Sequence, residues 1–191
     1  MLDYDTPRYP IRQAAAAAGF ELNTLRSLYQ RGHFEIVGGE EAKARGLAAF
    51  LNLRDVMHIA VSKRLIDMGI HASDAFIAGK DFAHTSSGRD AGQHAHRLPA
   101  ELYRGGFTVL VYHPALGSGR VLPMTDGLQF SDLFHDPHAG GRHNPVVIFL
   151  NDVEREVFTA LNVTPATNVE RLSAITARGA SAPRQHEGPS K

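Results

Sequence analysis

Apolar residues recur at helical spacing through residues 8–83 and predict four helices there. Two short ones, over residues 11–18 and 22–31, stop at Gly19 and Gly32. Asn52 is expected to cap a long third helix, with Asp55 as the reciprocal partner of a capping box. Gly69 ends that helix, and a fourth covers about 73–83. The third helix has a buried stripe of six residues: Leu53, Val56, Met57, Ala60, Val61 and Leu65.

Strand patterns dominate the second half of the chain. Residues 107–112 and 121–124 are expected to pair across the turn 117–119, and residues 146–150 form an apolar run typical of a strand buried on both faces. Residues 128–134 predict a helical turn, and 135–144 a polar loop. Asn151 and Glu154 predict a second capping box, which opens a helix to about 162. Its buried stripe would be Val153, Val157, Phe158 and Leu161, and a last short helix covers 169–177.

These patterns predict an α+β protein with two units. Residues 8–83 form a helical N-terminal domain, and residues 84–97, nearly free of large apolar groups, form a linker. Residues 98–179 form a small mixed α/β C-terminal domain that binds an effector or makes a dimer. Residues 180–191 form a disordered tail.

Composition narrows the class of protein. The 20 basic and 20 acidic side chains balance, so a chain that coats nucleic acid by charge alone is excluded, while a local basic face is not. The absence of cysteine excludes disulfides and thiolate ligands and fits a reducing cytoplasm. The first ten residues lack the basic and apolar regions typical of a signal peptide, and no apolar run approaches the length of a membrane helix. We expect a cytoplasmic protein.

The spacing of the first two helices is that of a helix-turn-helix, because only residues 19–21 separate them. A short strand at 34–37, a turn-prone stretch at 38–46 and an apolar segment at 47–51 then predict a hairpin. A hairpin in that place is a wing, and the domain is predicted to be a winged helix-turn-helix.

Candidate DNA contacts lie on the second helix, where no acidic side chain occurs between Leu22 and His33. Arginine can bind guanine, asparagine and glutamine can bind adenine, and hydroxyls reach bases or phosphates. The helix offers Asn23, Thr24, Arg26, Ser27, Gln30 and Arg31, of which all but Gln30 are the predicted main contacts. Arg12 on the first helix and Lys43 and Arg45 in the wing would contact the phosphate backbone.

Residues 9–75 resemble the N-terminal domain of MerR-type regulators. Ile11, the alanine run and Gly19 stand where that family has its opening motif, and the Thr-Leu-Arg motif is residues 24–26. After Gly32 and the wing, an aromatic and an aspartate open the long helix, here Phe50 and Asp55. The family's leucine, glycine and apolar residue at the end of that helix are Leu65, Gly69 and Ile70. The resemblance implies a transcriptional regulator that binds double-stranded DNA as a homodimer.

Three departures from that family reduce the expected phosphate contacts. Ala48 and Ala49 occupy the place of an arginine before the wing aromatic, Ser27 and Leu28 replace an aromatic pair, and the wing is acidic at residues 40–41. An alternative is therefore a phage-type accessory or adaptor module, which keeps the winged fold and binds protein.

The second unit carries histidines and aromatic residues. Effector binding, dimerisation and contact with RNA polymerase are its three open roles, and a small-molecule effector is favoured over a metal. Aromatic candidates for its pocket are Tyr103, Phe107, Tyr112, Phe130, Phe134 and Phe149, and the histidines are His84, His94, His96, His113, His135, His138 and His143. No phosphate-binding loop, nucleophile elbow or HExxH motif occurs, so no enzyme, cofactor or metal is predicted.

Overall fold

The computed structural model describes residues 2–39, 50–86, 97–103, 106–124, 135–136, 141–142 and 144–164, and it has the predicted α+β class. Its helices are α1 (Ile11–Ala17), α2 (Leu22–Gln30), α3 (Leu53–Asp67), α4 (Ala72–His84) and α5 (Leu150–Ala160). Its strands are β1 (Tyr9–Pro10), β2 (Phe50–Leu51), β3 (Phe107–His113), β4 (Ser118–Met124), β5 (His135–Asp136), β6 (Gly141–Arg142) and β7 (Val146–Phe149).

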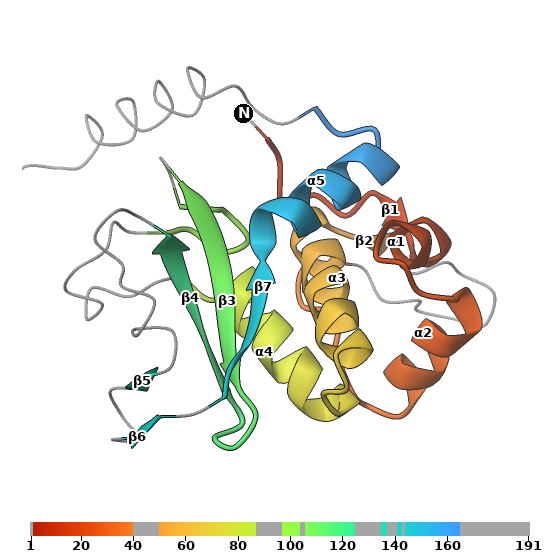
Figure 1. Cartoon of the computed structure of the whole chain (residues 1–191). Coiled ribbons are helices and arrows are strands. Elements are labelled where there is room, and N and C mark those ends of the chain that lie inside the picture. The colour runs from red at the N-terminus through yellow and green to blue at the C-terminus, as the bar shows by residue number, and fades with distance from the viewer. Residues whose placement is uncertain are drawn as a thin grey trace, which may run out of the picture.

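Helix α3 runs through the centre of the molecule, and α1, α4 and α5 pack around it (Figure 1). Asn52 Oδ1 accepts a hydrogen bond from the Asp55 amide at 2.9 Å, and Asp55 Oδ2 accepts one from the Asn52 amide, so the predicted capping box is confirmed. All six residues of the predicted stripe are buried. Asp55, His58 and Ser62 are buried as well, so α3 has little polar surface on its first three turns.

One antiparallel sheet, in the order β4-β3-β7, packs against the helices. The predicted β3–β4 hairpin is confirmed, with Val109 opposite Leu122. Leu110, Tyr112 and Ile148 on one face of the sheet join the same apolar core as the helices. Val109, Val111 and Leu122 form a second cluster on the other face. The segments predicted as two domains therefore share one core across the predicted linker.

Strand β7 and helix α5 depart from the sequence prediction. Within the described sheet β7 pairs with β3 alone, and Phe149 is 46% exposed, so the strand is not buried on both faces. The predicted Asn151 capping box is wrong, because α5 begins at Leu150 without a side-chain cap. Asn151 Oδ1 instead accepts the Thr108 amide at 2.6 Å, which ties the start of α5 to β3.

The predicted strand at residues 34–37 is wrong. Residues 34–37 form no strand, because Asp55 Oδ1 accepts the Val37 and Gly38 amides at 3.1 and 3.3 Å. Leu51 in β2 lies opposite Tyr9 in β1 instead. Residues 40–49, which include most of the predicted wing, lie outside the described residues, as do the helical turn at 128–134, the helix at 169–177 and the tail.

Arg97 is a structural residue that the sequence prediction placed in a linker. Its guanidinium is buried over the Phe82 ring, at 5.2 Å from the centroid. It donates to the carbonyl oxygens of Phe82 at 2.9 Å and Thr85 at 2.7 Å, near the end of α4. Arg97 thus satisfies carbonyls that a helix end leaves without partners.

The backbones of α3 and α4 approach closely at Gly79. A Cβ at this position would collide with Ser62 Oγ and lie 2.8 Å from the His58 carbonyl oxygen. Beside it, His58 Nε2 and the Phe76 carbonyl oxygen are 2.8 Å apart, so the buried imidazole donates to α4. The two helices are therefore joined by direct contact and by a hydrogen bond.

We expect acid to destabilise the fold through buried His58 and partly buried His84. Burial lowers the pKa of His58 to about 3 and that of His84 to about 4, with nearby Lys80 acting in the same direction on both and Arg54 on His84. Because unfolded histidine has a pKa near 6.5, the unfolded state binds more protons below that pH. Stability present above pH 6.5 is then lost as the pH falls, by about 2 kcal/mol for His58 at pH 5. Thermal melts at pH 7 and pH 5 measure the loss.

Two variants test the origin of this pH dependence. His84→Gln removes the partly buried imidazole and should reduce the difference between the melts, whereas His71→Gln alters an exposed histidine and should not. Burial raises the pKa of Asp55, which opposes the effect, and both variants keep Asp55. An unchanged difference in His84→Gln would contradict the assignment.

Candidate nucleic-acid interface

A tight turn joins α1 to α2. Gly19 has φ +75°, a conformation that glycine adopts without steric cost. Its amide donates to the Ala16 carbonyl at 3.1 Å, and the Phe20 amide donates to the Ala15 carbonyl at 2.9 Å. These two bonds form a Schellman cap, which turns the chain and places Phe20 in the core against Phe76. The predicted helix-turn-helix spacing thus corresponds to a real turn between two packed helices.

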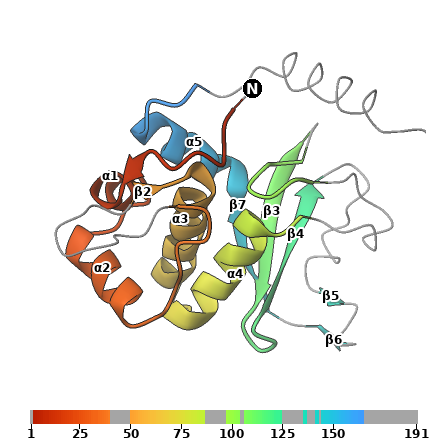
Figure 2. The same ribbon diagram turned by 180° about the vertical axis from the view of Figure 1, so that it is seen from behind.

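Helix α2 lies at the edge of the molecule, on the far side of α3 from the sheet (Figures 1 and 2). Leu25 on its inner side is fully buried, and Leu22 and Leu28 are partly buried against the same core. At the end of α2, Tyr29 contacts Phe34, whose ring stacks on Phe76 at 4.7 Å. The inner side therefore fixes the helix while the outer side remains accessible.

The outer side of α2 carries only polar side chains. Because a helix has about 3.6 residues per turn, Asn23, Arg26, Ser27 and Gln30 share one face. Asn23, Arg26 and Gln30 are exposed and Ser27 is half-buried. Thr24 and Arg31 are exposed on the flank of that face. Two amides, a guanidinium and a hydroxyl on one helical face can donate to and accept from base edges.

Gln30 is the face residue that the predicted main contacts omitted. Its signal in the sequence is its spacing, since it lies seven residues after Asn23 and four after Arg26. Arg31, which was included, marks the end of the helix as its C-cap. The structure therefore centres the candidate interface on the row from residue 23 to residue 30.

The predicted backbone contacts are divided between described and undescribed parts of the chain. Arg12 is exposed on the first turn of α1. Lys43 and Arg45 lie outside the described residues. Glu21 and Glu35, both exposed, flank the polar row on either side along the chain. The basic character of this surface is therefore confined to α2 and its immediate neighbours.

Asp55 anchors the chain where the predicted wing begins. Its carboxylate accepts three backbone amides, from Val37, Gly38 and Asn52, while its side chain is almost completely buried. His84 Nε2 lies 3.6 Å from the same carboxylate. Sequence reasoning identified Asp55 as a cap but not as the acceptor that holds residues 37–38.

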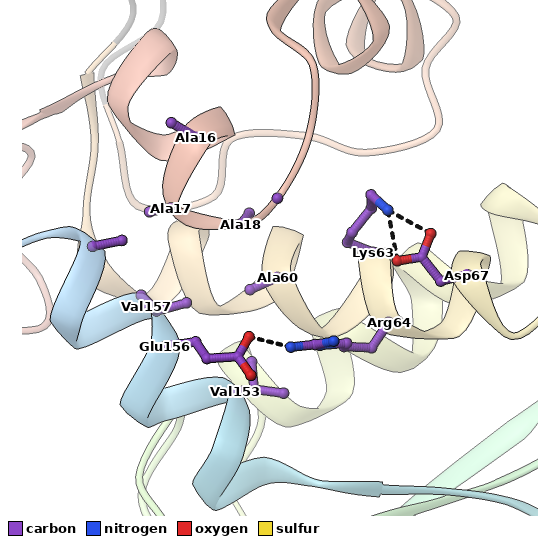
Figure 3. Close-up of a pocket in the computed structure, with 12 residues that line it drawn as sticks. Ala16, Ala17, Ala18, Ala60, Lys63, Arg64, Asp67, Val153, Glu156 and Val157 are labelled. Atoms are coloured by element: carbon purple, nitrogen blue, oxygen red, sulfur yellow. Dashed lines mark hydrogen bonds and ion pairs between the residues drawn. The ribbon is translucent and has the colours of Figure 1, made fainter.

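A groove between α1, α3 and α5 is a second candidate site (Figure 3), with a volume of about 390 Å³. Its lining is mostly small: Ala16, Ala17, Ala18, Gly19, Ala60, Lys63, Arg64, Asp67, Val153, Glu156, Val157 and Ala160. Lys63 pairs with Asp67, and Arg64 pairs with Glu156 across to α5. A volume in this range suits a small ligand.

The aromatic residues predicted for an effector pocket do not line this groove. Tyr103 and Tyr112 are buried, whereas Phe107 and Phe149 are exposed and contact each other edge to face at 6.1 Å. Phe130 and Phe134 lie outside the described residues.

Only some of the histidines of the predicted cluster lie within the described residues. His84 lies near Asp55, His113 is buried at the end of β3, and His135 lies in β5. His94, His96, His138 and His143 are outside the described residues. Within the described part of the chain, no group of three or more His, Asp or Glu is placed to hold a metal ion.

Comparisons with protein-family models, with curated proteins and with solved structures find no match for this chain. Among the described residues, no helix is both long and apolar enough to cross a membrane. The MerR resemblance therefore stays a prediction carried by the motifs themselves.

Removing the Asp55 carboxylate should destabilise the protein and loosen residues 37–38. We expect Asp55→Ala to lower the free energy of unfolding by about 1–3 kcal/mol, because the α3 cap is lost and buried amides lose their acceptor. Urea unfolding measures the change. Asp67→Ala, which removes an exposed carboxylate from the same helix, is the matched control and should change stability far less. Equal losses in the two variants would refute the anchoring role.

Proposed function

We propose that this chain is a cytoplasmic, MerR-like transcriptional regulator that binds double-stranded DNA through a winged helix-turn-helix. Helix α2 enters the major groove, and α1 crosses the phosphate backbone with Arg12. The row Asn23, Arg26, Ser27 and Gln30 reads base edges, with Thr24 and Arg31 at its flanks. Lys43 and Arg45 contact phosphates from the wing.

The observation that carries the proposal is the division of α2 into two sides. Leu25 is fully buried, yet Asn23, Arg26 and Gln30 are exposed. No acidic residue interrupts residues 22–33, so the side facing outward can approach a polyanion. The Schellman turn at Gly19 fixes this helix relative to α1.

A homodimer on a two-fold symmetric site is part of the proposal. One α2 offers few base contacts, and two copies on adjacent half-sites double them. Helix α5 is 11 residues long, which is short for a coiled-coil seam but enough to pack against its twin. An effector bound in the groove of α1, α3 and α5 would contact the turn at Gly19 and so could reach the recognition helix. RNA polymerase is a further proposed partner.

Arg26→Ala should weaken specific DNA binding by about 1–3 kcal/mol, because a bidentate contact to guanine is lost. Genome-wide occupancy of the tagged protein defines the site, and fluorescence anisotropy on that site measures the change. Arg120→Ala is the matched control, since it removes an arginine from strand β4 of the sheet, on the opposite side of α3 from α2, and should not alter affinity. Arg26→Ala should also leave the thermal melt unchanged.

A salt titration distinguishes DNA binding from the adaptor alternative, which should show little binding to DNA at any salt concentration. Wild-type binding should weaken steeply with salt as phosphates release counterions. Discrete occupancy peaks that share a symmetric motif and vanish in Arg26→Ala would support the regulator. A flat profile from the folded, expressed protein would overturn it.

The adaptor alternative is favoured by a specific feature at the base of the wing. Val37 and Phe50 are 49% and 38% exposed on either side of the undescribed segment. Exposed apolar side chains suit a protein surface better than phosphates. In that case Val37→Ser would disrupt the function while Arg26→Ala would not.

A further inference from the structure

Two histidines that the sequence analysis did not single out meet at the end of the candidate recognition helix. His33 follows α2 in its C-terminal cap, where its amide donates to the Leu28 carbonyl at 3.0 Å. His71 is the N-cap residue of α4 and is exposed. Their ring centroids lie 6.2 Å apart, with the rings at 67° to each other. Residues 38 positions apart in the sequence thus place two imidazoles side by side.

The partners of His71 determine which of its nitrogens holds the proton. Ser73 Oγ donates its single proton to Asp74 Oδ1, at 3.2 Å. Toward His71 Nδ1, at 2.8 Å, the same hydroxyl oxygen must therefore accept, so Nδ1 carries the hydrogen. The lone pair of His71 is then on Nε2. Histidine ligands of metal ions are commonly oriented by donating their second ring N–H to an oxygen acceptor, and here the Ser73 hydroxyl would be that acceptor.

The distance between the rings suits a shared ion. Metal–nitrogen bonds of about 2.1 Å put the centroids of two ligating imidazoles about 5 Å apart at a tetrahedral angle and about 6.4 Å apart when they are collinear. The observed 6.2 Å lies near the collinear end of that range. A tetrahedral ion requires the two rings to lie closer together than they do here. A rotation of the His33 side chain, in the turn after α2, would bring them closer.

We propose that His33 and His71 bind a divalent transition-metal ion of the zinc or nickel type, with Ser73 and Asp74 as positioning residues for His71. Imidazole nitrogen suits these ions, and water completes the coordination, because no third described His, Asp or Glu joins the pair. The bound ion links the C-terminal end of α2 to the N-terminal end of α4. The binding is a property of the free protein and does not depend on the proposed DNA interaction.

Calorimetric titration of the full chain with ZnCl₂ and NiCl₂ tests the site. His33→Ala and His71→Ala should each weaken binding of one equivalent by about tenfold or more, since one of two ligands is lost. Ser73→Ala keeps both imidazoles and should also weaken it by about tenfold through loss of orientation. The double variant His94→Ala, His96→Ala is the control and should still bind one equivalent of metal with unchanged affinity. Far-UV circular dichroism checks that each variant is folded.

Histidine ring NMR gives a second measurement. In metal-free protein the His71 nitrogen shifts should report the Nδ1–H tautomer, and zinc should move the ring signals of both His33 and His71. Three results would each overturn the proposal. The first is an Nε2–H tautomer of His71, and the second is one equivalent of metal still bound by His33→Ala and His71→Ala. The third is loss of that equivalent only in the His94→Ala, His96→Ala variant.

Discussion

The fold depends on hydrogen bonds to the Asp55 carboxylate, which α3 places in the core. An unpaired buried charge is costly, and Asp55 is accommodated because three backbone amides converge on it. One of those amides belongs to its own helix start, and two belong to the chain that leads toward the predicted wing. The same carboxylate therefore caps α3 and fixes the path of residues 37–38. His84 beside this carboxylate extends the dependence to the end of α4.

Contacts with that core fix the orientation of the candidate interface. Helix α2 has only nine residues, too few to be stable alone, so its orientation depends on Leu25 and on the rings that follow it. Phe34 stacks on Phe76, and Phe76 lies next to His58 of the central helix. A chain of aromatic contacts thus connects the outward-facing polar row to the most buried part of the molecule. The groove at the C-terminal end of α1 touches the turn that leads into α2, so Gly19 links the two candidate sites.

Local signals in the sequence predicted local structure well. Gly19, Gly32 and Gly69 marked helix ends correctly, since each has positive φ, and the Asn52–Asp55 box formed as expected. The errors came from interactions between distant residues. Asn151 had the pattern of a cap, yet it accepts from Thr108, 43 positions away, and Val37 had the pattern of a strand, yet its amide pairs with a side chain. The polar row of α2 was predictable because helical periodicity alone defines it, whereas the His33–His71 pair needed the tertiary fold.

Gly79 has a consequence for tracing the ancestry of this protein. Since hydrogen is the only side chain that fits between α4 and the His58 carbonyl, substitutions there would be eliminated even as surface positions diverge. Between α4 and the sheet the fit is looser, because a Cβ at Gly119 would lie 3.6 Å from the Ala78 Cβ, which is ordinary van der Waals contact. Remote homologues should therefore share a glycine at position 79, set by the spacing of α3 and α4, after the sequences of α2 have lost all resemblance.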